Sequence, residues 1–145
     1  MSGKNLHNKR FDEATLVKLG VFEEYTEEWL PVFITSGFGP VQIFDFFAGT
    51  GYDKNGTAGS PIRILNKIKK QVPQIVKNRA KIEVHFNEFE PGKRDQRKFE
   101  MLAEAVGEYL AANKDVSDAT TVSLHNKDLK KSFRSFYQEF EHIRL

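Results

Sequence analysis

Residues 44–65 read FDFFAGTGYDKNGTAGSPIRIL, which places two glycine-containing turns between a strand-like run and a helix-like one. The run Val41–Phe47 is rich in β-branched and aromatic residues and too short for a helix, so it predicts a buried strand. Ser60 and Pro61 predict a helix start, with serine as the N-cap and proline at the first helical position. A glycine-rich turn directly after a buried strand is where α/β folds bind nucleotides.

The rest of the chain alternates strand-like and helix-like segments. Alternating polarity predicts a second strand over Lys81–Phe89, and β-propensity predicts a third over Ala119–His125. Apolar residues at helical spacing predict a helix within Pro91–Asn113 and a final one from Leu129 to Phe140. The sequence therefore predicts an α/β fold with about three parallel strands and right-handed crossovers.

The N-terminal part divides into two segments before this repeat begins. Residues 1–10 are polar and are expected to be loose, and residues 11–38 carry an apolar stripe typical of a helix packed on a core. Pro31 is expected to end or kink that helix, and Pro73 to interrupt the helix that follows Ser60. Residues 39–145 then form the expected ligand-binding half-domain.

Composition limits the possible classes of protein. The chain has 145 residues, of which 39% are apolar, enough for one ordinary core. It has no cysteine, which excludes disulfides and thiolate metal sites and fits a reducing cytoplasm. Its four histidines lie far apart without metal-ligand spacing, so no metal site is predicted. Without a signal peptide or an apolar run of about 20 residues, the sequence predicts a soluble cytoplasmic protein with no membrane span.

Charge gives little information about partners, since the formal net charge is only +2. One basic cluster extends from Lys67 to Lys81 and another from Lys127 to Arg134. A solvated helix face explains such clusters more simply than a nucleic-acid footprint, which requires basic charge concentrated on one surface. Nucleic-acid binding therefore stays a minor alternative.

Three loops supply residues suited to a nucleotide-like ligand. Gly49 and Gly51 follow the first strand and allow close backbone approach, which favours a ligand loop over a merely structural turn. Glu88 follows the second strand, where it could accept ribose hydroxyl groups or simply end a strand at the surface. Asp128 follows the third strand and could reach an adenine or cap a helix. For Asp45, ligand binding and capping of neighbouring amides remain two open alternatives.

These residues carry a resemblance to a known class. DFFAGTG resembles the first motif of S-adenosylmethionine-dependent methyltransferases and is similar to the Phe-Ala-Gly-x-Gly form of cytosine-5 DNA methyltransferases. The longer stretch, together with the KLGVFEEYTEEWLPVF helix before it, resembles the three-Cys-motif partner proteins more closely. The resemblance covers most of the chain from about Lys18 and is most specific between Asp45 and Pro61.

The resemblance implies an incomplete Rossmann-like methyltransferase fold that binds S-adenosylmethionine. It implies that the first loop holds the methionine end of the cofactor, that Glu88 accepts the ribose hydroxyls, and that the third loop addresses the adenine. Ser60 is expected to be an N-cap and not a ligand residue. The residues implied to contact the cofactor are Asp45, Phe47, Ala48, Gly49, Thr50, Gly51, Glu88, Asp128 and Leu129.

The sequence also departs from the methyltransferase pattern. It has no Pro-Cys nucleophile and no Asn/Asp-Pro-Pro-aromatic motif, so no catalytic residue can be named and catalysis is not predicted for this chain. With no fourth strand, the strand at Val41–Phe47 would present an unpaired edge, so self-association or a protein partner is expected there. A non-catalytic adaptor that uses the half-fold for assembly is the alternative function.

Overall fold

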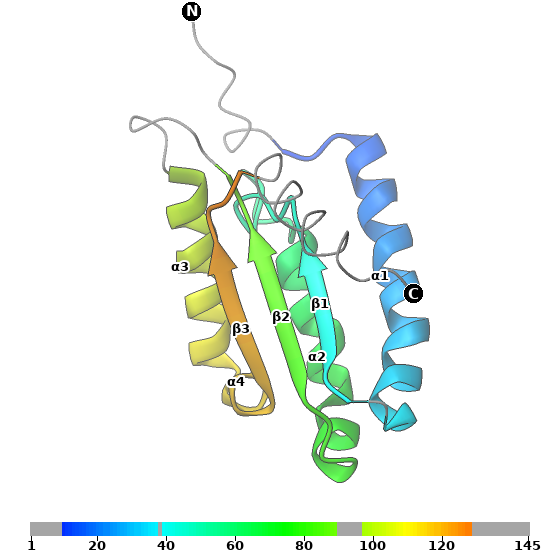
Figure 1. Ribbon diagram of the computed structural model, residues 1–145. Helices are drawn as coiled ribbons and strands as arrows, with labels where there is room; N and C mark the ends of the chain where they lie inside the picture. The colour runs from blue at the N-terminus through cyan, green and yellow to red at the C-terminus, as the bar shows by residue number, and fades with distance from the viewer. Residues whose placement is uncertain (1–9, 38, 90–96, 129–145) are drawn as a thin grey trace, which may run out of the picture.

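The computed structural model describes residues 10–37, 39–89 and 97–128. Three parallel strands form one open sheet in the order β1-β2-β3. Four helices accompany the sheet, and the whole is compatible with part of a Rossmann-like fold (Figure 1). The elements are α1 (Glu13–Ser36), β1 (Val41–Asp45), α2 (Ser60–Lys77), β2 (Ile82–Asn87), α3 (Arg97–Ala112), α4 (Lys114–Ala119) and β3 (Thr120–His125).

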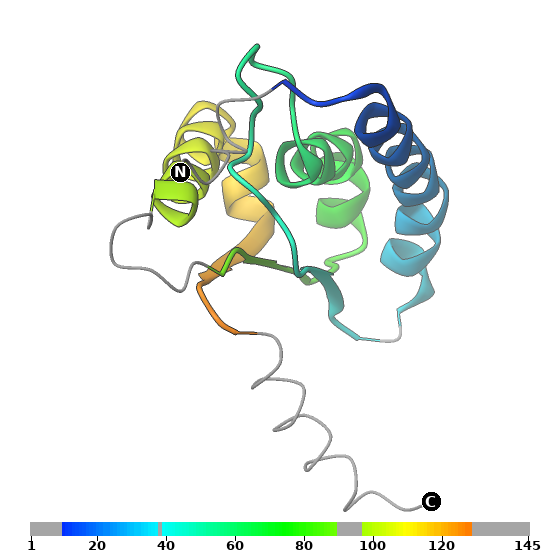
Figure 2. The same ribbon diagram turned by 90° about the horizontal axis from the view of Figure 1, so that it is seen from above.

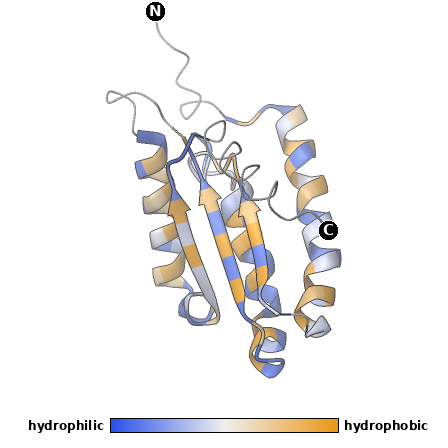
Figure 3. Ribbon diagram, in the orientation of Figure 1, coloured by the Kyte–Doolittle hydropathy of each residue, from blue (hydrophilic) through white to orange (hydrophobic). Residues whose placement is uncertain are grey.

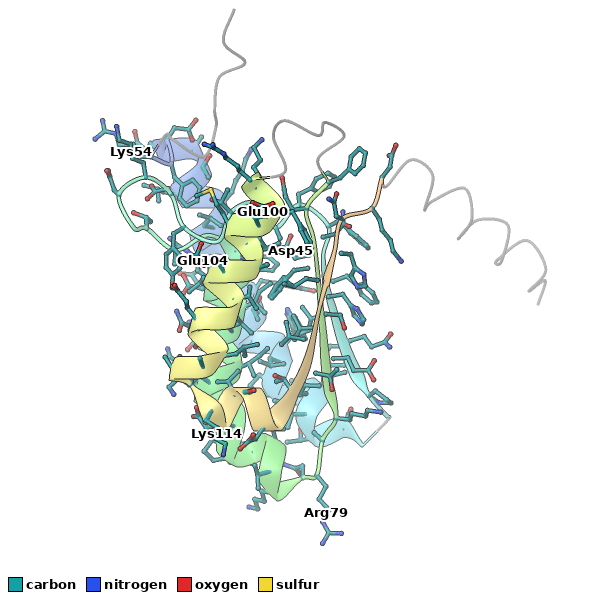
Figure 4. All side chains as sticks on the ribbon, turned by 90° about the vertical axis from the view of Figure 1, so that its left-hand side faces the viewer. Asp45, Lys54, Arg79, Glu100, Glu104 and Lys114 are labelled. Atoms are coloured by element: carbon teal, nitrogen blue, oxygen red, sulfur yellow. The ribbon has the colours of Figure 1, made fainter. Side chains whose placement is uncertain are left out.

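The helices lie on one side of the sheet, as Figure 2 shows from above and Figure 4 shows edge-on. Apolar side chains that face the helices alternate along the strands with polar side chains on the other face. The alternation is visible along β2 in Figure 3. Val84 and Phe86 of β2 are fully buried and pack in one core with Leu65 and Ile68 of α2. This single layer of core is the main source of apolar burial in the described residues.

The other face of the sheet carries no helix from the described residues. A row of rings crosses it from β1 to β3: Phe44 stacks on His85 with ring centroids 4.7 Å apart, and His85 meets His125. The two imidazoles lie nearly in one plane, with His85 Nδ1 3.1 Å from His125 Nε2, so one ring donates a hydrogen bond to the other. Burial, assisted by the nearby Lys127 and by His85, lowers the pKa of His125.

Most of the predicted elements are confirmed, with different ends. The predicted strands are all present, although β1 ends at Asp45 instead of Phe47 and β2 is shorter at both ends. The short helix α4 was not predicted. The predicted final helix after Leu129 lies outside the described residues.

Neither of the two internal prolines ends its helix, contrary to that part of the prediction. Helix α1 continues through Pro31 to Ser36 and is followed by Gly37, a left-handed C-cap with φ +70°. Helix α2 likewise continues through Pro73 to Lys77. Each proline removes one backbone donor, but buried residues on both sides of it, such as Leu30 and Ile34 in α1, hold the helix against the core.

No helix within residues 10–37, 39–89 and 97–128 combines the length and the apolar character needed to cross a membrane.

The loop between β1 and α2 is fixed to α3 through Gly51. This residue has φ +92°, and a Cβ built on it would lie 2.7 Å from the Cβ of Ala105. Its carbonyl oxygen accepts a hydrogen bond from the Gly59 amide at 2.7 Å. Gly51 is therefore required for packing, whatever else the loop does.

Replacing Gly51 by alanine should lower the free energy of unfolding by about 2–4 kcal/mol, through left-handed strain and overpacking against Ala105. Gly56→Ala is the matched control, because Gly56 has φ +77° and open space around it. It should lose only the strain component, about 1–2 kcal/mol. Urea unfolding measures both. Equal losses in the two variants would contradict the packing role, and Ala105→Gly should partly restore Gly51→Ala.

Candidate functional site

The carboxyl ends of all three strands meet at one rim of the sheet. Asn87, at the end of β2, is 6% exposed and connects the segments on both sides of it. Its side-chain amide nitrogen donates to the carbonyl oxygens of Lys127 (3.1 Å) and Phe46 (3.4 Å), and its side-chain oxygen accepts from the Lys127 amide (3.0 Å). Its own carbonyl oxygen accepts from the Ala48 amide at 3.0 Å. One buried side chain thus fixes the chain beyond β1 and beyond β3.

Gly49 and Glu88 are brought together at this rim, as the sequence predicted. The Gly49 amide donates to Glu88 Oε2 at 2.8 Å, and the Glu88 amide donates to the His125 carbonyl oxygen at 3.0 Å. Gly49 has φ +72°, and nothing lies within 4 Å of the position its Cβ would take. The rim therefore leaves open space beside the Gly49 backbone, next to the half-buried Glu88 carboxylate.

Asp45 ends β1 and is held by two donors. Its carboxylate accepts a hydrogen bond from the Ser60 hydroxyl, at the start of α2, and one from the Phe47 amide at 3.2 Å. Burial raises the pKa of the Asp45 carboxyl, and the two hydrogen bonds oppose that shift. The alternative in which Asp45 caps a neighbouring amide is thus confirmed, and this bond does not exclude a ligand.

The expectation that Ser60 is the N-cap of α2 is wrong. The N-cap is Gly59, which provides no side-chain hydrogen bond, and Ser60 is the first helical residue. The Ser60 hydroxyl is directed to Asp45 because the two residues face each other across the start of α2 and the end of β1. Ser60 therefore belongs to the surroundings of the candidate site.

The other predicted residues of the first loop have separate environments. Phe47 is 81% exposed, whereas Ala48 is buried and its amide is already bonded to Asn87. The Thr50 hydroxyl donates to the Tyr52 carbonyl oxygen at 2.7 Å. Gly51 packs against α3, as described above. Gly49 is thus the position of the glycine turn where a ligand has room to approach the backbone.

The third loop reaches the same rim through Lys127, which is bonded to Asn87. Asp128 follows it directly and so lies close to this rim in the chain. Leu129 lies outside the described residues. Within the part of the chain that is described, no group of three histidine, aspartate or glutamate side chains could hold a metal ion.

The lysines of α2 are largely paired with acidic residues. Lys67 and Lys70 approach Glu27 of α1 at 2.7 and 3.7 Å, and Lys69 pairs with Asp115 of α4 at 3.1 Å. A shallow depression between α1 and α2 includes these lysines together with Glu23 and Asn66. Because acidic groups balance the lysines here, this surface does not present the concentrated basic charge that phosphate binding requires.

Comparison of the chain with known protein families, with characterised proteins and with solved structures finds no match. The site is therefore described from its own geometry. Asn87 and Ser60 are the residues of this rim that sequence reasoning missed. For Asn87, the signal was an amide side chain near the carboxyl end of the predicted strand Lys81–Phe89.

Asn87→Leu, which keeps the branched shape of the side chain but removes all three side-chain hydrogen bonds, should lower the free energy of unfolding by about 2–3 kcal/mol. Buried groups left without partners account for the loss. The matched control is Asn78→Leu, at the exposed end of α2, whose side chain bonds only to Gln74 of the same helix. Chemical denaturation compares the two. A similar loss in both variants would show that Asn87 does not hold the rim together.

Asp45→Asn should raise the melting temperature, and the gain should be largest at neutral pH. A carboxyl whose pKa is raised by folding favours the folded state less as pH rises through its unfolded and folded pKa values. The gain should therefore vanish as the pH falls below the range in which Asp45 becomes protonated. Thermal unfolding followed by circular dichroism from pH 7 to about pH 3 tests this, because the ordinary aspartate pKa lies near 4. Asp118→Asn, on the exposed side of α4, serves as the control, and a variant less stable than wild type at pH 7 would contradict the prediction.

Proposed function

We propose that the rim binds an adenosyl ligand of the S-adenosylmethionine type, as part of a methyltransferase-like α/β domain. The observation that carries the proposal is the environment of Gly49, which follows the first parallel strand. This glycine is left-handed and has open space beside it, and its amide donates a hydrogen bond to the Glu88 carboxylate. Ligands of open parallel sheets bind outside the carboxyl ends of the strands. Because no atom lies within 4 Å of the position that a Cβ of Gly49 would take, a ligand could contact the backbone there.

The charge of the rim supports a ligand of this type. S-adenosylmethionine carries a positive sulfonium and an ammonium group, and the rim holds the carboxylates of Asp45 and Glu88. Burying the Asp45 carboxyl raises its pKa, so the group is kept at the expense of stability, as is common at functional sites. A cationic ligand next to Asp45 would offset that penalty.

Each loop has one role in this proposal. Asp45 and the backbone from Phe47 to Gly51 hold the methionine end, and Glu88 accepts the ribose hydroxyls through a carboxylate that can take several hydrogen bonds. Asp128 and Leu129 address the adenine. The bound cofactor would supply an electrophilic methyl group, and this chain would contribute binding and orientation.

Titration calorimetry with S-adenosylhomocysteine tests the proposal. Wild type should bind with a micromolar Kd, and Gly49→Val should abolish binding, because the side chain would fill the open space beside the loop. Gly56→Val is the matched control, since Gly56 has a similar φ (+77°) and equally open surroundings. It follows Lys54 by two residues, and Figure 4 shows Lys54 well apart from Asp45. The control should bind as wild type does.

Glu88→Ala should weaken binding by about ten- to a hundredfold, the range expected for hydrogen bonds to a charged group. Glu88→Gln, which keeps an acceptor oxygen, should lose less. Absence of heat and of thermal stabilisation with folded wild-type protein would contradict the proposal and favour the non-catalytic adaptor. Binding of a duplex oligonucleotide with steep salt dependence would instead favour the nucleic-acid alternative.

A further inference from the structure

His85 of β2 and His125 of β3 form a hydrogen-bonded pair on the face of the sheet opposite the described helices. His85 is in register with Ser123, so His125 lies two residues further along the parallel strand. The facing nitrogens are 3.1 Å apart and the ring centroids 5.4 Å apart, so the two rings meet end to end. One facing nitrogen must donate and the other must accept. The bond therefore requires that one of them carries no proton.

The pair can accept one additional proton without losing this bond, but not two. A single imidazolium still donates to the neutral ring, and that hydrogen bond is charge-assisted. Two imidazolium rings carry a proton on every nitrogen, so two donors would face each other at 3.1 Å and two positive charges would be adjacent. Such a pair titrates as a unit, and the second proton is the one that the folded state resists.

The neighbouring side chains of β1 and β2 do little to offset this repulsion. From β1 the uncharged Phe44 ring stacks on His85, with centroids 4.7 Å apart. On β2, Glu83 precedes His85 by two residues on the same face. Its carboxylate is already engaged, because it accepts a hydrogen bond from Gln42 Nε2 at 2.8 Å and lies 3.6 Å from Lys81 Nζ. A second imidazolium would therefore gain little from this carboxylate.

The chain after β3 adds a positive charge near the pair. Burial is the largest cause that lowers the pKa of His125, and the charges of Lys127 and His85 lower it further. Asp128 is the next charged residue along the chain. Two hydrogen bonds to the Asn87 side chain hold the Lys127 backbone at the rim. Moving Lys127 away from the pair would therefore break contacts of the rim.

The pair also lies directly below the contacts of the candidate site. The His125 carbonyl oxygen accepts a hydrogen bond from the Glu88 amide at 3.0 Å, and the Glu88 carboxylate accepts one from the Gly49 amide at 2.8 Å. If His125 separates from β2, Glu88 loses the bond that fixes its backbone. The position of the carboxylate beside the glycine turn then changes as well.

We propose that the His85–His125 pair is a pH-sensitive switch that holds the carboxyl ends of β2 and β3 together at neutral pH and releases them when both rings are protonated. In mildly acidic solution the end of β3 separates, and the amides of Glu88 and Lys127 lose their partners across the two strands. Opening of a strand end of this kind requires less free energy than global unfolding. The switch follows from the geometry of the pair and does not depend on the adenosyl ligand.

Urea unfolding of the full chain at a series of pH values tests the cost of the second proton. His125→Gln places an amide near the position of Nε2 but cannot be protonated, and His142→Gln is the matched control. Free histidines take up protons near pH 6.5, so below that pH the unfolding constant of wild type should rise up to about tenfold more per pH unit than that of His125→Gln. The control should keep the wild-type slope. Equal slopes in wild type and His125→Gln would overturn the proposal.

Amide hydrogen exchange measured by NMR locates the opening. The amides of Glu88 and Lys127 are bonded at the rim, whereas the Val41 amide is bonded to the Lys81 carbonyl oxygen at the opposite end of the sheet. Lowering the pH from one unit above to one unit below about 6.5 should reduce the protection of the two rim amides at least tenfold, after correction for intrinsic exchange, and leave Val41 protected. In His125→Gln the rim amides should stay protected. Equal loss of protection at both ends of the sheet would show global unfolding and overturn the switch.

Discussion

The described structure depends on contacts that keep the carboxyl ends of the three parallel strands aligned at one edge of the sheet. Parallel strands are not joined by tight turns, so each strand end must be fixed by contacts with segments distant in sequence. Here the buried side chain of Asn87 binds the chain after β1 and the chain after β3, and backbone bonds from Ala48 and Glu88 complete the connection. The glycine turn, the Glu88 carboxylate and the third loop are adjacent because of these contacts. The geometry of the candidate site is therefore a result of how the sheet ends.

The same rim contains the least favourable electrostatic arrangement among the described carboxyls. Burial raises the pKa of Asp45, whereas hydrogen bonds or ion pairs lower the pKa of exposed carboxyls such as Asp53 and Asp115. The Ser60 hydroxyl partly compensates for this burial. An uncharged residue at this position would avoid the cost of burying a charge, and for this reason the proposed function assigns the Asp45 carboxylate to a cationic ligand.

The sequence predicted those features that depend on local pattern. Residue composition, alternation and β-propensity identified the three strands, helical spacing identified the long helices, and the glycine turn follows β1 as predicted. Features that depend on contacts between distant segments could not be predicted: the bonds of Asn87, the pairing of Ser60 with Asp45, and the packing of Gly51 on Ala105. The helices continue through Pro31 and Pro73 for the same reason, since local propensity is a weaker influence than burial of the surrounding helix. The cofactor itself remains a proposal, because a pattern of residue types does not specify a ligand.

The contact between Gly51 and α3 affects how the proposed site would bind a ligand. With the Gly51 Cα against Ala105 and its carbonyl bonded to Gly59, this end of the loop is anchored before any ligand arrives. An anchored loop loses little conformational entropy on association, so most of the interaction energy would be retained as affinity. It also restricts induced fit. Selectivity of the proposed site would then depend on its fixed shape, because a ligand of the wrong shape would clash with the main chain at Gly49.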